Sequence, residues 1–571
     1  MFGADIGRRK LRRGARVLKR TARRVAKGVL RRGPARSGQP SDASSIGMVE
    51  IFEQRQVVGW VEANSDRFPI RVALFINDVE VASTWADDPS QHNTRRMIRS
   101  FRFALYDIWQ FCHKRDRLTV RIDGRPVPIA AKGTYKRPGK DGKHTLADLK
   151  HRFDEGYMFG QTGRLQLSKK LDTVWQDSVF GLYEKVSAIV SSKHGYDPFV
   201  IYGSLLGLVR EGGFIGHDID FDAAYLSRCT DGREAATELR DIAFTLIDAG
   251  LDVECMRTAL HIRDVTDPRI RIDLFHLYFD KNDEIAFPFG VAGNTKLTKD
   301  AWPGVTEAQL AGRTVRAPAN AAALVEHIYG KNWRTPIAGF NWDRARTGWA
   351  REGWSPLEYS EEVYWANFYA RTEFTTGSTF FESIVAREDV PRTVLDIGCG
   401  DGRDAFAFAR GGFRAIGIDR SHIGIRHATQ KAADAGLDAS LEFEACDVSD
   451  ADAMRAVITK ARSLADDGRT LFYLRFFLHS IPEAVQDALL AIIAEHARDG
   501  DVLAAEFRTE EDASNPKVYG KHYRRYQNGR AFGVSLAERY GFTVSHEEEG
   551  TGLAPYKDED PVLYRVVATR G

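Results

Sequence analysis

The stretch YGSLLGLVREGGFIGHDIDFD, from Tyr202 to Asp222, places aspartates at three alternate positions, Asp218, Asp220 and Asp222. A strand is expected from Ile219 to Leu226, and side chains two residues apart in a strand share a face. Three like charges on one face repel each other, and a divalent cation relieves that repulsion best. The alternation therefore predicts a cation site whose ligands are all oxygens, which favours Mg²⁺ or Mn²⁺.

A fourth aspartate, Asp273, lies farther along the chain in RIRIDLFHLYF, from Arg269 to Phe279. The clean alternation of this stretch predicts a second strand. Asp273 has apolar neighbours, and a carboxylate inside a strand costs free energy unless it is paired or bound to a metal. We therefore expect Asp273 to join the other aspartates in one site.

These motifs, IYGS, then IDFDA, then RIDLF, resemble the signature of the nucleotidyltransferase superfamily. The longer stretch GSLLGLVREGGFIGHDIDFD is similar to its LicD and fukutin branch, and HIYGKNW, His327 to Trp333, resembles that branch's closing motif. The resemblance covers about residues 166–345. It implies the transfer of a phospho-substituent, such as phosphocholine or an alditol phosphate, from a cytidine diphosphate (CDP)-linked donor to a sugar hydroxyl.

The same resemblance implies a role for each motif residue. Asp220 and Asp222 would hold the metal that bridges the donor's phosphates, and Asp273 would complete the site as third ligand or as general base. The residues implied in donor binding are Gly203 and Ser204, where the backbone approaches a phosphate, and Arg210. Gly216-His217 and Ile219 stand where Pro-Trp and Asp are usual, and this departure bears on the identity of donor and acceptor.

A second stretch, TVLDIGCGDGRDAFAFARGGFRAIGIDRS from Thr393 to Ser421, predicts a strand, a glycine-rich turn, a helix and a second strand ending in Asp419. An acid about twenty residues after the glycines, at the end of the next strand, binds ribose hydroxyls. The spacing Asp-x-Gly-x-Gly-x-Gly resembles class I S-adenosylmethionine (SAM)-dependent methyltransferases over about residues 360–571 and implies a doubly wound sheet. The SAM-binding residues implied by this resemblance are Asp396, Gly398, Gly400, Gly402, Asp419 and Asp447.

Farther along, TLFYLRFFLHSI, Thr470 to Ile481, resembles the fourth strand of that family and the active-site edge after it. His479 is the candidate catalytic base, and a structural histidine is an equally good interpretation. Arg475 is a candidate for orienting an anionic acceptor, with a surface residue as the alternative. Whether oxygen or nitrogen receives the methyl group stays open.

The start of the chain is strongly basic. The first 36 residues hold 14 Lys or Arg and one acid, Asp5, so they carry a net charge of +13, against +2 for the whole chain. Apolar residues from Leu11 to Val29 recur at helical spacing, which predicts an amphipathic helix on an anionic membrane surface, with a disordered tail as the alternative. No aromatic residues are interleaved with these charges, so no nucleic-acid partner is expected. Scattered cysteines and the lack of a long apolar run predict a cytoplasmic protein, peripheral at the inner face of the membrane.

The expected fold is multidomain. Its parts are a basic amphipathic arm and linker at 1–47, a small all-β, β-sandwich-like accessory module at 48–132, an α+β, LicD-like nucleotidyltransferase domain at 150–350, and an α/β, Rossmann-like methyltransferase domain at 360–571. The expected function combines phospho-substituent transfer from a CDP-linked donor to a glycan or lipid-linked glycan with SAM-dependent methylation of the glycan or its phospho-group; the order of the two reactions stays open. Two alternatives remain: a methyltransferase whose LicD-like domain only binds a nucleotide or glycan, and a membrane-associated scaffold for polysaccharide assembly.

Overall fold

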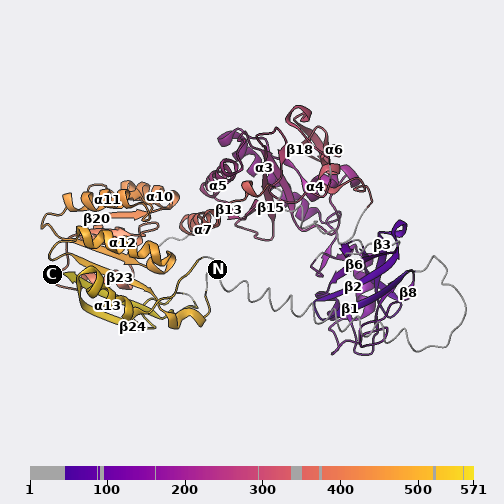
Figure 1. Ribbon diagram of the computed structural model, residues 1–571, viewed down its shortest axis with the longest axis horizontal. Helices are drawn as coiled ribbons and strands as arrows, with labels where there is room; N and C mark the ends of the chain where they lie inside the picture. The colour runs from indigo at the N-terminus through magenta and orange to yellow at the C-terminus, as the bar shows by residue number, and fades with distance from the viewer. Residues whose placement is uncertain are drawn as a thin grey trace, which may run out of the picture. The chain divides into compact units, whose positions relative to one another are not determined.

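The computed structural model describes residues 45–86, 88–90, 96–160, 162–293, 295–335, 350–371, 376–517, 523–556 and 558–571. The predicted basic arm lies outside the described residues apart from its last three positions. The chain divides into two compact units (Figure 1). The described parts of 45–105 and 112–143 make up the first, and those of 106–111, 144–336 and 340–571 make up the second.

The first unit consists of two four-stranded sheets, which agrees with the expected small all-β module. Period-two alternation buries one face of each strand, as in β2, where Val57, Val61 and Ala63 are buried. One sheet has the order β1 (Ile46–Phe52), β2 (Gln56–Asn64), β6 (Arg96–Ala104), β5 (Asp88–Ser90); the other has the order β4 (Val79–Ala86), β3 (Ile70–Ile76), β7 (Leu118–Ile122), β8 (Arg125–Pro126).

The second unit begins with a mixed sheet around two parallel strands. The sheet has the order β11 (Phe199–Val200), β12 (Phe221–Leu226), β15 (Arg271–Phe279), β14 (Ala259–Arg263), β13 (Asp252–Cys255), with β16 (Ile285–Ala286) paired to β15. Of these strands only β12 and β15 are paired in parallel; the other pairings are antiparallel. The helices of this part are α2 (Leu146–Asp154), α3 (Thr173–His194), α4 (Tyr202–Glu211), α5 (Gly232–Asp248) and α6 (Ala321–Tyr329). Two antiparallel hairpins lie outside the sheet: β9 (Tyr157–Phe159) pairs with β10 (Leu165–Leu167), and β17 (Val305–Leu310) pairs with β18 (Arg313–Pro318).

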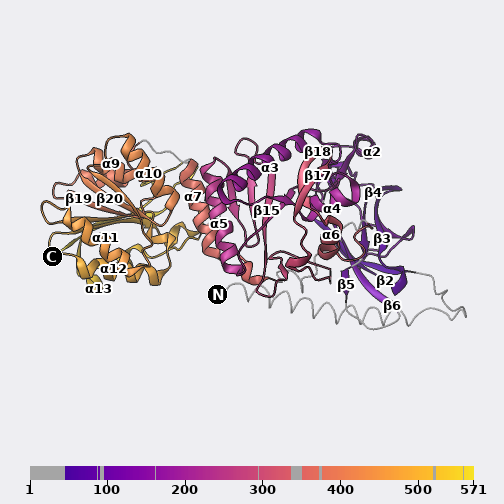
Figure 2. The same ribbon diagram turned by 90° about the horizontal axis from the view of Figure 1, so that it is seen from above.

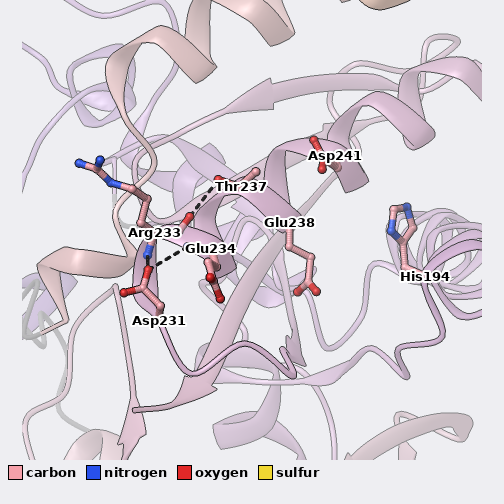
Figure 3. Close-up of a pocket in the computed structure, with 7 residues that line it drawn as sticks. All are labelled: His194, Asp231, Arg233, Glu234, Thr237, Glu238 and Asp241. Atoms are coloured by element: carbon pink, nitrogen blue, oxygen red, sulfur yellow. Dashed lines mark hydrogen bonds between the residues drawn. The ribbon is translucent and has the colours of Figure 1, made fainter. Parts of the chain in front are cut away.

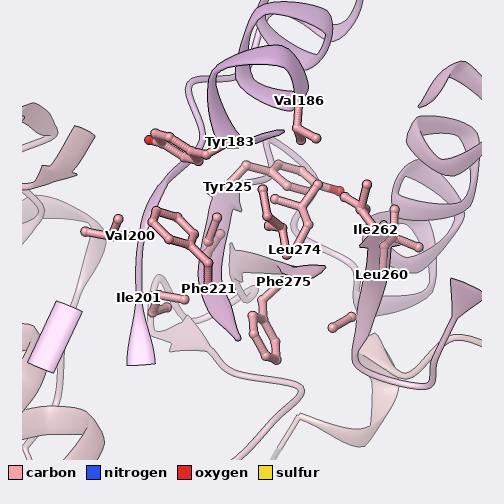
Figure 4. Close-up of a cluster of buried hydrophobic side chains, with 14 of the residues drawn as sticks. Tyr183, Val186, Val200, Ile201, Phe221, Tyr225, Leu260, Ile262, Leu274 and Phe275 are labelled. Atoms are coloured by element: carbon pink, nitrogen blue, oxygen red, sulfur yellow. The ribbon is translucent and has the colours of Figure 1, made fainter. Parts of the chain in front are cut away.

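Both faces of the central strand β15 are covered, so every residue from Ile272 to Phe279 is buried. Helices α3 and α5 pack against β15 and against each other. Figure 4 shows aromatic and aliphatic side chains of β12, β14 and β15 meeting Tyr183 and Val186 of α3. A carboxylate on such a strand, Asp273, therefore lies at the border of a large apolar core.

The last part of the second unit is a doubly wound sheet, as expected for a Rossmann-like domain. Five parallel strands are extended by two antiparallel ones, in the order β21 (Leu441–Ala445), β20 (Arg414–Asp419), β19 (Thr393–Ile397), β22 (Thr470–Arg475), β23 (Val502–Arg508), β25 (Leu563–Arg570), β24 (Phe542–Gly550). The strand order reverses between β19 and β22, and open α/β sheets bind ligands at such a switch point.

Helices cover both faces of this sheet (Figure 2). One apolar core lies under α8 (Thr379–Val385), α9 (Arg403–Arg410) and α10 (His422–Asp434), and the other under α11 (Ala451–Ser463), α12 (Glu483–His496) and α13 (Gly529–Tyr540). Neighbouring residues of β19 point to opposite cores, Val394 to the first and Leu395 to the second. This double burial explains why every residue of the strand is buried.

Helix α7 (Leu357–Arg371) joins the two parts of the second unit. Its Val363 and Ala366 are buried in the apolar core around the sheet of β11 to β16, and Ile423 of α10 belongs to the same core. The Asn367 side chain accepts a hydrogen bond from the Val253 backbone N–H on edge strand β13 (3.1 Å). No helix among the described residues is both long and apolar enough to cross a membrane.

Candidate active sites

Strands β12 and β15 bring the predicted aspartates together. Their parallel register pairs Asp222 directly with Asp273, and the antiparallel register of β14 pairs His261 with Asp273. Paired residues of neighbouring strands lie on one face, so the three side chains form a row across the sheet. His261 Nε2 lies 3.5 Å from Asp273 Oδ2.

The beginning of helix α4 holds Asp222. The Gly203 backbone N–H donates to Asp222 Oδ2 (2.8 Å), and the Asp222 N–H donates to Ser204 Oγ (2.9 Å). A carboxylate at a helix N-terminus is stabilised by the unpaired N–H groups there. A Cβ added at Gly203 would lie 2.7 Å from Asp218 Oδ2, so a side chain at this position would displace that carboxylate. Gly203 and Ser204 thus contact the carboxylate and backbone of Asp222, where the sequence predicted contact with a phosphate.

The strand begins later than expected, at Phe221, so Asp218 and Asp220 precede it. The Asp218 N–H donates to the Ile215 carbonyl (3.1 Å) in a turn. Asp218 is 9% exposed; burial first, and then the nearby Asp220, raises its pKa to about 8. Burial likewise raises the pKa of Asp222, and that of Asp273 to about 7. These shifts favour the protonated forms of the three carboxyl groups.

A cation that the sequence did not single out lies among these acids. The guanidinium of Arg271 hydrogen-bonds through Nη2 to Asp220 Oδ2 and to Asp273 Oδ2 (3.1 Å), and its Nε lies 2.8 Å from Asp273 Oδ1. Arg271 is two residues before Asp273 on the same strand face, a relation that was present in the quoted stretch RIRIDLF.

The fit of a divalent cation can be judged from this arrangement. The oxygen-rich donor set suits Mg²⁺ or Mn²⁺. Yet within the described ranges no three acidic, His or Cys side chains converge as metal ligands. Asp220 and Asp273 are bridged by Arg271, while Asp222 faces helix α4. The residues as arranged do not form a metal site.

The other predicted donor-site residue, Arg210, is paired with its neighbour. Its Nη2 donates to Glu211 Oε1 (2.7 Å), and Lys170 Nζ contacts the second oxygen of Glu211 (2.5 Å). Tyr329, from the closing motif HIYGKNW, lies near Asp218 and Asp222, and burial together with these acids raises its pKa. Tyr329 is thus a further residue of the site.

A pocket lies elsewhere, on the outer side of α5 (Figure 3). It contains no residue of the motifs and is lined by His194, Asp231, Arg233, Glu234, Thr237, Glu238 and Asp241. Asp231 caps α5 by accepting the N–H groups of Arg233 (2.8 Å) and Glu234 (3.1 Å), and His194 hydrogen-bonds Thr245 (2.8 Å). These polar groups have structural roles.

The predicted glycine-rich turn follows β19 at the switch point. Gly398, Gly400 and Gly402 have φ of +77°, +61° and +84°, a backbone region that side chains disfavour. The Gly400 N–H donates to Asp419 Oδ2 (3.0 Å), which ties the turn to the end of β20. A Cβ at any of the three glycines would meet an aromatic side chain: Phe477, Tyr369 or Phe443.

The three predicted acids lie around this turn in different settings. Asp396, on β19, is 3% exposed, and burial and the neighbouring Asp404 raise its pKa well above the usual range. Asp419 accepts hydrogen bonds from Gly400 and from the Ser421 N–H (2.8 Å), and burial raises its pKa. Asp447 follows β21, is exposed, and accepts from the Ser449 N–H (2.8 Å). This cradle of glycines, acids and aromatic rings fits a nucleoside-type cofactor.

Beside the turn lies a buried network that the sequence did not predict in full. Asp404 accepts from Ser378 Oγ and from Tyr473 OH, both at 2.7 Å. Arg475 Nε lies 3.2 Å from Glu506 Oε1, and Arg565 Nε donates to Glu506 Oε2 (2.6 Å). The charge of Arg475 is therefore matched by buried acids.

The candidate base His479 is 3% exposed. Its Nδ1 faces the Arg508 backbone N–H at 3.5 Å, and its carbonyl accepts from the Arg525 N–H (2.7 Å). The Arg525 guanidinium further contacts the carbonyls of Leu478 and Ile481 (3.3 Å each). These contacts anchor the segment after β22.

Family models of known proteins match one segment in each of the two parts of the second unit. The family model "LicD/FKTN/FKRP, nucleotidyltransferase domain" matches residues 195–320, and the model "Methyltransferase domain" matches residues 389–463. No curated protein matches the chain.

Solved methyltransferase structures are similar to about a third of the chain. A SAM-dependent methyltransferase from Anabaena variabilis is 15% identical, with 37% of this chain and 93% of that chain covered and a TM-score of 0.28. TehB from Haemophilus influenzae is 12% identical, with 36% and 66% covered and a TM-score of 0.27. The glycopeptide N-methyltransferase MtfA, complexed with SAM, is 17% identical, with 35% and 96% covered and a TM-score of 0.26. On the two family models, the chain combines a LicD-type nucleotidyltransferase domain with a methyltransferase domain.

Proposed function

We propose that the protein is a bifunctional enzyme of cell-surface polysaccharide biosynthesis. Its LicD-type domain transfers a phospho-substituent, of the phosphocholine or alditol-phosphate type, from a CDP-linked donor to a glycan or lipid-linked glycan. Its methyltransferase domain uses SAM to methylate the glycan or the added phospho-group. The observation that carries the proposal is the pairing of Asp222 with Asp273 on adjacent parallel strands of a LicD-type domain, in a chain that also carries a methyltransferase domain.

The chemistry of the LicD-type site supports phosphoryl-type transfer. Such transfer depends on positioning and charge neutralisation and needs no covalent nucleophile. Asp273, with a pKa raised to about 7 by burial, suits a general base that accepts the proton of the acceptor hydroxyl near neutral pH. Mg²⁺ or Mn²⁺, with Asp220, Asp222 and Asp273 as candidate ligands, belongs to this proposal. No step is assigned to the cation, because Arg271 bridges two of these residues.

The cradle after β19 supports SAM as cofactor of the second domain. Asp419 at the end of β20 would bind the ribose hydroxyls, the glycines would allow close approach of the methionine part, and Asp447 is the candidate adenine contact. SAM supplies the methyl group when bound. The residues around the turn then align cofactor and acceptor for in-line displacement, with His479 as the candidate base.

The basic arm supports a peripheral position at the inner face of the membrane. Its charge would attract anionic headgroups, and its apolar stripe would insert at their boundary. This position would bring the enzyme to a lipid-linked acceptor. Joining the domains raises the effective concentration of the first product at the second site.

The test is product analysis by mass spectrometry. Full-length protein is incubated with CDP-linked donors, Mg²⁺, SAM and a lipid-linked glycan extract. Wild type should give a phospho-substituted, methylated product; Asp222→Asn should lose the phospho-group and Asp419→Ala the methyl group. If wild type adds neither mass from any CDP-linked donor or from SAM, the proposal fails.

SAM binding is tested separately by calorimetry. Wild type and Asp434→Ala, which changes an exposed acid of α10, should bind SAM alike, and Asp419→Ala should not. Equal binding by all three variants would contradict the role of Asp419.

A second candidate function keeps only the methyltransferase active, with the LicD-type domain binding a nucleotide or glycan. The presence of Arg271 among the acids favours it. Thermal shift discriminates, because a bound ligand stabilises the fold by mass action. Shifts with both SAM and cytidine nucleotides, together with turnover of the CDP-linked donor, support the bifunctional enzyme; binding without turnover supports the second candidate.

A further inference from the structure

The first unit carries a strongly basic surface at the start of β7. Two segments, 112–118 and 132–143, meet there, and the backbones of Leu118 and Lys136 exchange hydrogen bonds of 2.8 and 2.9 Å. The two segments contain eight Lys or Arg and two acids, a net charge of +6, against +2 for the whole chain. The eight cations, which we call the basic surface, are Lys114, Arg115, Arg117, Lys132, Lys136, Arg137, Lys140 and Lys143. All of them except Lys136 are exposed, so the surface attracts anions from solution.

The two acids of these segments neutralise little of this charge. Asp116 accepts hydrogen bonds from the Asn77 side chain (2.9 Å) and from the His113 backbone N–H (2.6 Å). Asp141 lies 3.5 Å from Lys114 Nζ and also accepts the Lys114 backbone N–H (2.8 Å). Six cations form no ion pair with a described residue: Arg115, Arg117, Lys132, Arg137, Lys140 and Lys143.

Like charges lie close together at one edge of the basic surface. Lys136 donates a hydrogen bond to the Phe52 carbonyl at the end of β1. Burial first, and then the nearby Lys132, lowers the pKa of Lys136, and Glu53 opposes this shift. Repulsion between neighbouring like charges costs free energy, which a bound anion would recover.

An exposed aromatic ring orients two of the arginines. The guanidinium carbons of Arg117 and Arg137 lie 5.0 and 5.8 Å from the centre of the Tyr135 ring, which is 37% exposed. A guanidinium that lies over a ring uses its face for that contact and keeps the N–H donors at its edge. Neither guanidinium donates a hydrogen bond to a described residue. Their free edges suit the oxygens of a phosphate group, which guanidinium groups bind through paired hydrogen bonds.

We propose that the basic surface binds an anionic glycan that carries phosphate groups. Arg117 and Arg137 bind one phosphate beside Tyr135, and the surrounding cations attract the neighbouring phosphates of the polymer. The choice of a glycan among polyanions rests on the proposed function. Since the first unit and the catalytic domains belong to one chain, a bound polymer would stay at a raised effective concentration for both reactions.

The experiment measures binding to the full-length protein by isothermal titration calorimetry. The probes are phosphomannan, a mannose polymer that carries phosphodiesters, and the same polymer after removal of its phosphate. Wild type should bind phosphomannan more tightly than the phosphate-free polymer. The double variant Arg117→Gln and Arg137→Gln should bind phosphomannan about tenfold more weakly, the effect expected for the loss of a charge-assisted hydrogen bond. Equal affinity of wild type for the two polymers, or equal affinity of wild type and the double variant, overturns the proposal.

A matched double variant separates a specific contact from general charge. Arg67 and Arg71 lie in the same unit and are paired with Asp123 and Glu80. Arg67→Gln with Arg71→Gln removes the same charge and should leave the affinity for phosphomannan unchanged. If this variant loses as much affinity as the first, the assignment to the basic surface is wrong.

The ring of Tyr135 is tested by a pair of variants. Tyr135→Ala should weaken binding about threefold, because the guanidinium groups lose the ring that orients them. Tyr135→Phe keeps the ring and should restore the affinity of wild type. Equal losses in both variants would contradict the role of the ring in the site.

Hydrogen–deuterium exchange locates the contact within the full-length protein, whose basic arm also attracts anions. Phosphomannan should slow exchange in residues 112–118 and 132–143 of wild type, and it should not do so in the first double variant. Protection confined to residues 1–40 overturns the proposal. The unfolding temperature of this variant without polymer should equal that of wild type, since both replaced arginines are exposed.

Other polyanions are outcomes of the same test. Phosphatidylglycerol vesicles and single-stranded DNA replace phosphomannan in the binding assay. If the first double variant loses more affinity for either of them than for phosphomannan, the surface serves a membrane or a nucleic acid and the proposal fails.

Product analysis separates this inference from the proposed function. If phosphomannan binds at the basic surface but the protein neither transfers a phospho-group nor methylates, the binding site stands and the enzyme assignment fails. If both activities are found but phosphomannan leaves exchange at the basic surface unchanged, the binding site is wrong and the enzyme assignment stands.

Discussion

Replacing Asp218 by Asn should change the pH dependence of stability in a defined direction. Asp218 is 9% exposed and its pKa is raised to about 8, against a usual value near 3.8. The folded state therefore keeps a proton that the unfolded chain has already lost above about pH 4. Unfolding releases this proton, so the contribution of Asp218 to stability falls as the pH rises from about 4 to about 8.

The magnitude follows from linkage. One released proton changes the free energy of unfolding by about 1.4 kcal/mol per pH unit, whatever the size of the pKa shift, as long as the pH stays between the two pKa values. The amide introduced by the substitution does not titrate. The free energy of unfolding of Asp218→Asn, minus that of wild type, should thus rise by roughly 2 to 3 kcal/mol between about pH 5 and pH 7.

The assay is urea unfolding followed by tryptophan fluorescence across this pH range, in EDTA so that no metal occupies the cluster. Asp267→Asn serves as control, because a hydrogen bond from Arg269 lowers the pKa of Asp267 and it stays ionised over this range. Its difference from wild type should not vary with pH. A difference for Asp218→Asn that is equally flat would refute the view that this carboxyl is held protonated.

Three other perturbations have expected outcomes. Gly203→Ala would place a Cβ 2.7 Å from an Asp218 oxygen and should lower the free energy of unfolding in urea by about 1–3 kcal/mol. Gly213→Ala, which has open space around its Cβ, should leave that free energy unchanged. Equal effects of the two substitutions would count against the steric argument. Glu506→Gln removes a fully buried charge between two arginines and should cost about 3 kcal/mol or more in thermal unfolding; an unchanged transition contradicts this. Deleting residues 1–40 should abolish co-sedimentation with anionic liposomes, and equal pelleting of both forms disproves the membrane proposal.

The sequence was most informative where a pattern is local. Asp273 was expected to join Asp222 in one site, and the direct pairing of these two residues on parallel strands agrees with that expectation. The alternation of Asp218, Asp220 and Asp222 put only Asp222 on the strand, because β12 begins at Phe221. The glycine turn and Asp419 also came together as predicted, because a turn with positive φ leaves few alternatives to glycine.

The sequence was least informative where a contact depends on the reach of a side chain or on the folded chain. Arg271 stood in a quoted motif, but nothing in the sequence fixes which acid a long, flexible guanidinium contacts. Gly203 and Ser204 were predicted to meet a phosphate, whereas they contact Asp222, because the start of α4 meets the start of β12 only after folding. The buried network around Asp404 joins three distant segments and has no local signature.

Helix α7 has a consequence for how the chain can be divided. Val363 and Ala366 seal one core, whereas a Cβ at Gly400 would meet the Tyr369 ring, so the same helix also closes the glycine turn. A fragment that starts after Arg371 would leave that turn open, and one that ends before Leu357 would uncover the edge of β13. A fragment that carries either domain alone must therefore keep α7 and cover the surface that the helix leaves exposed.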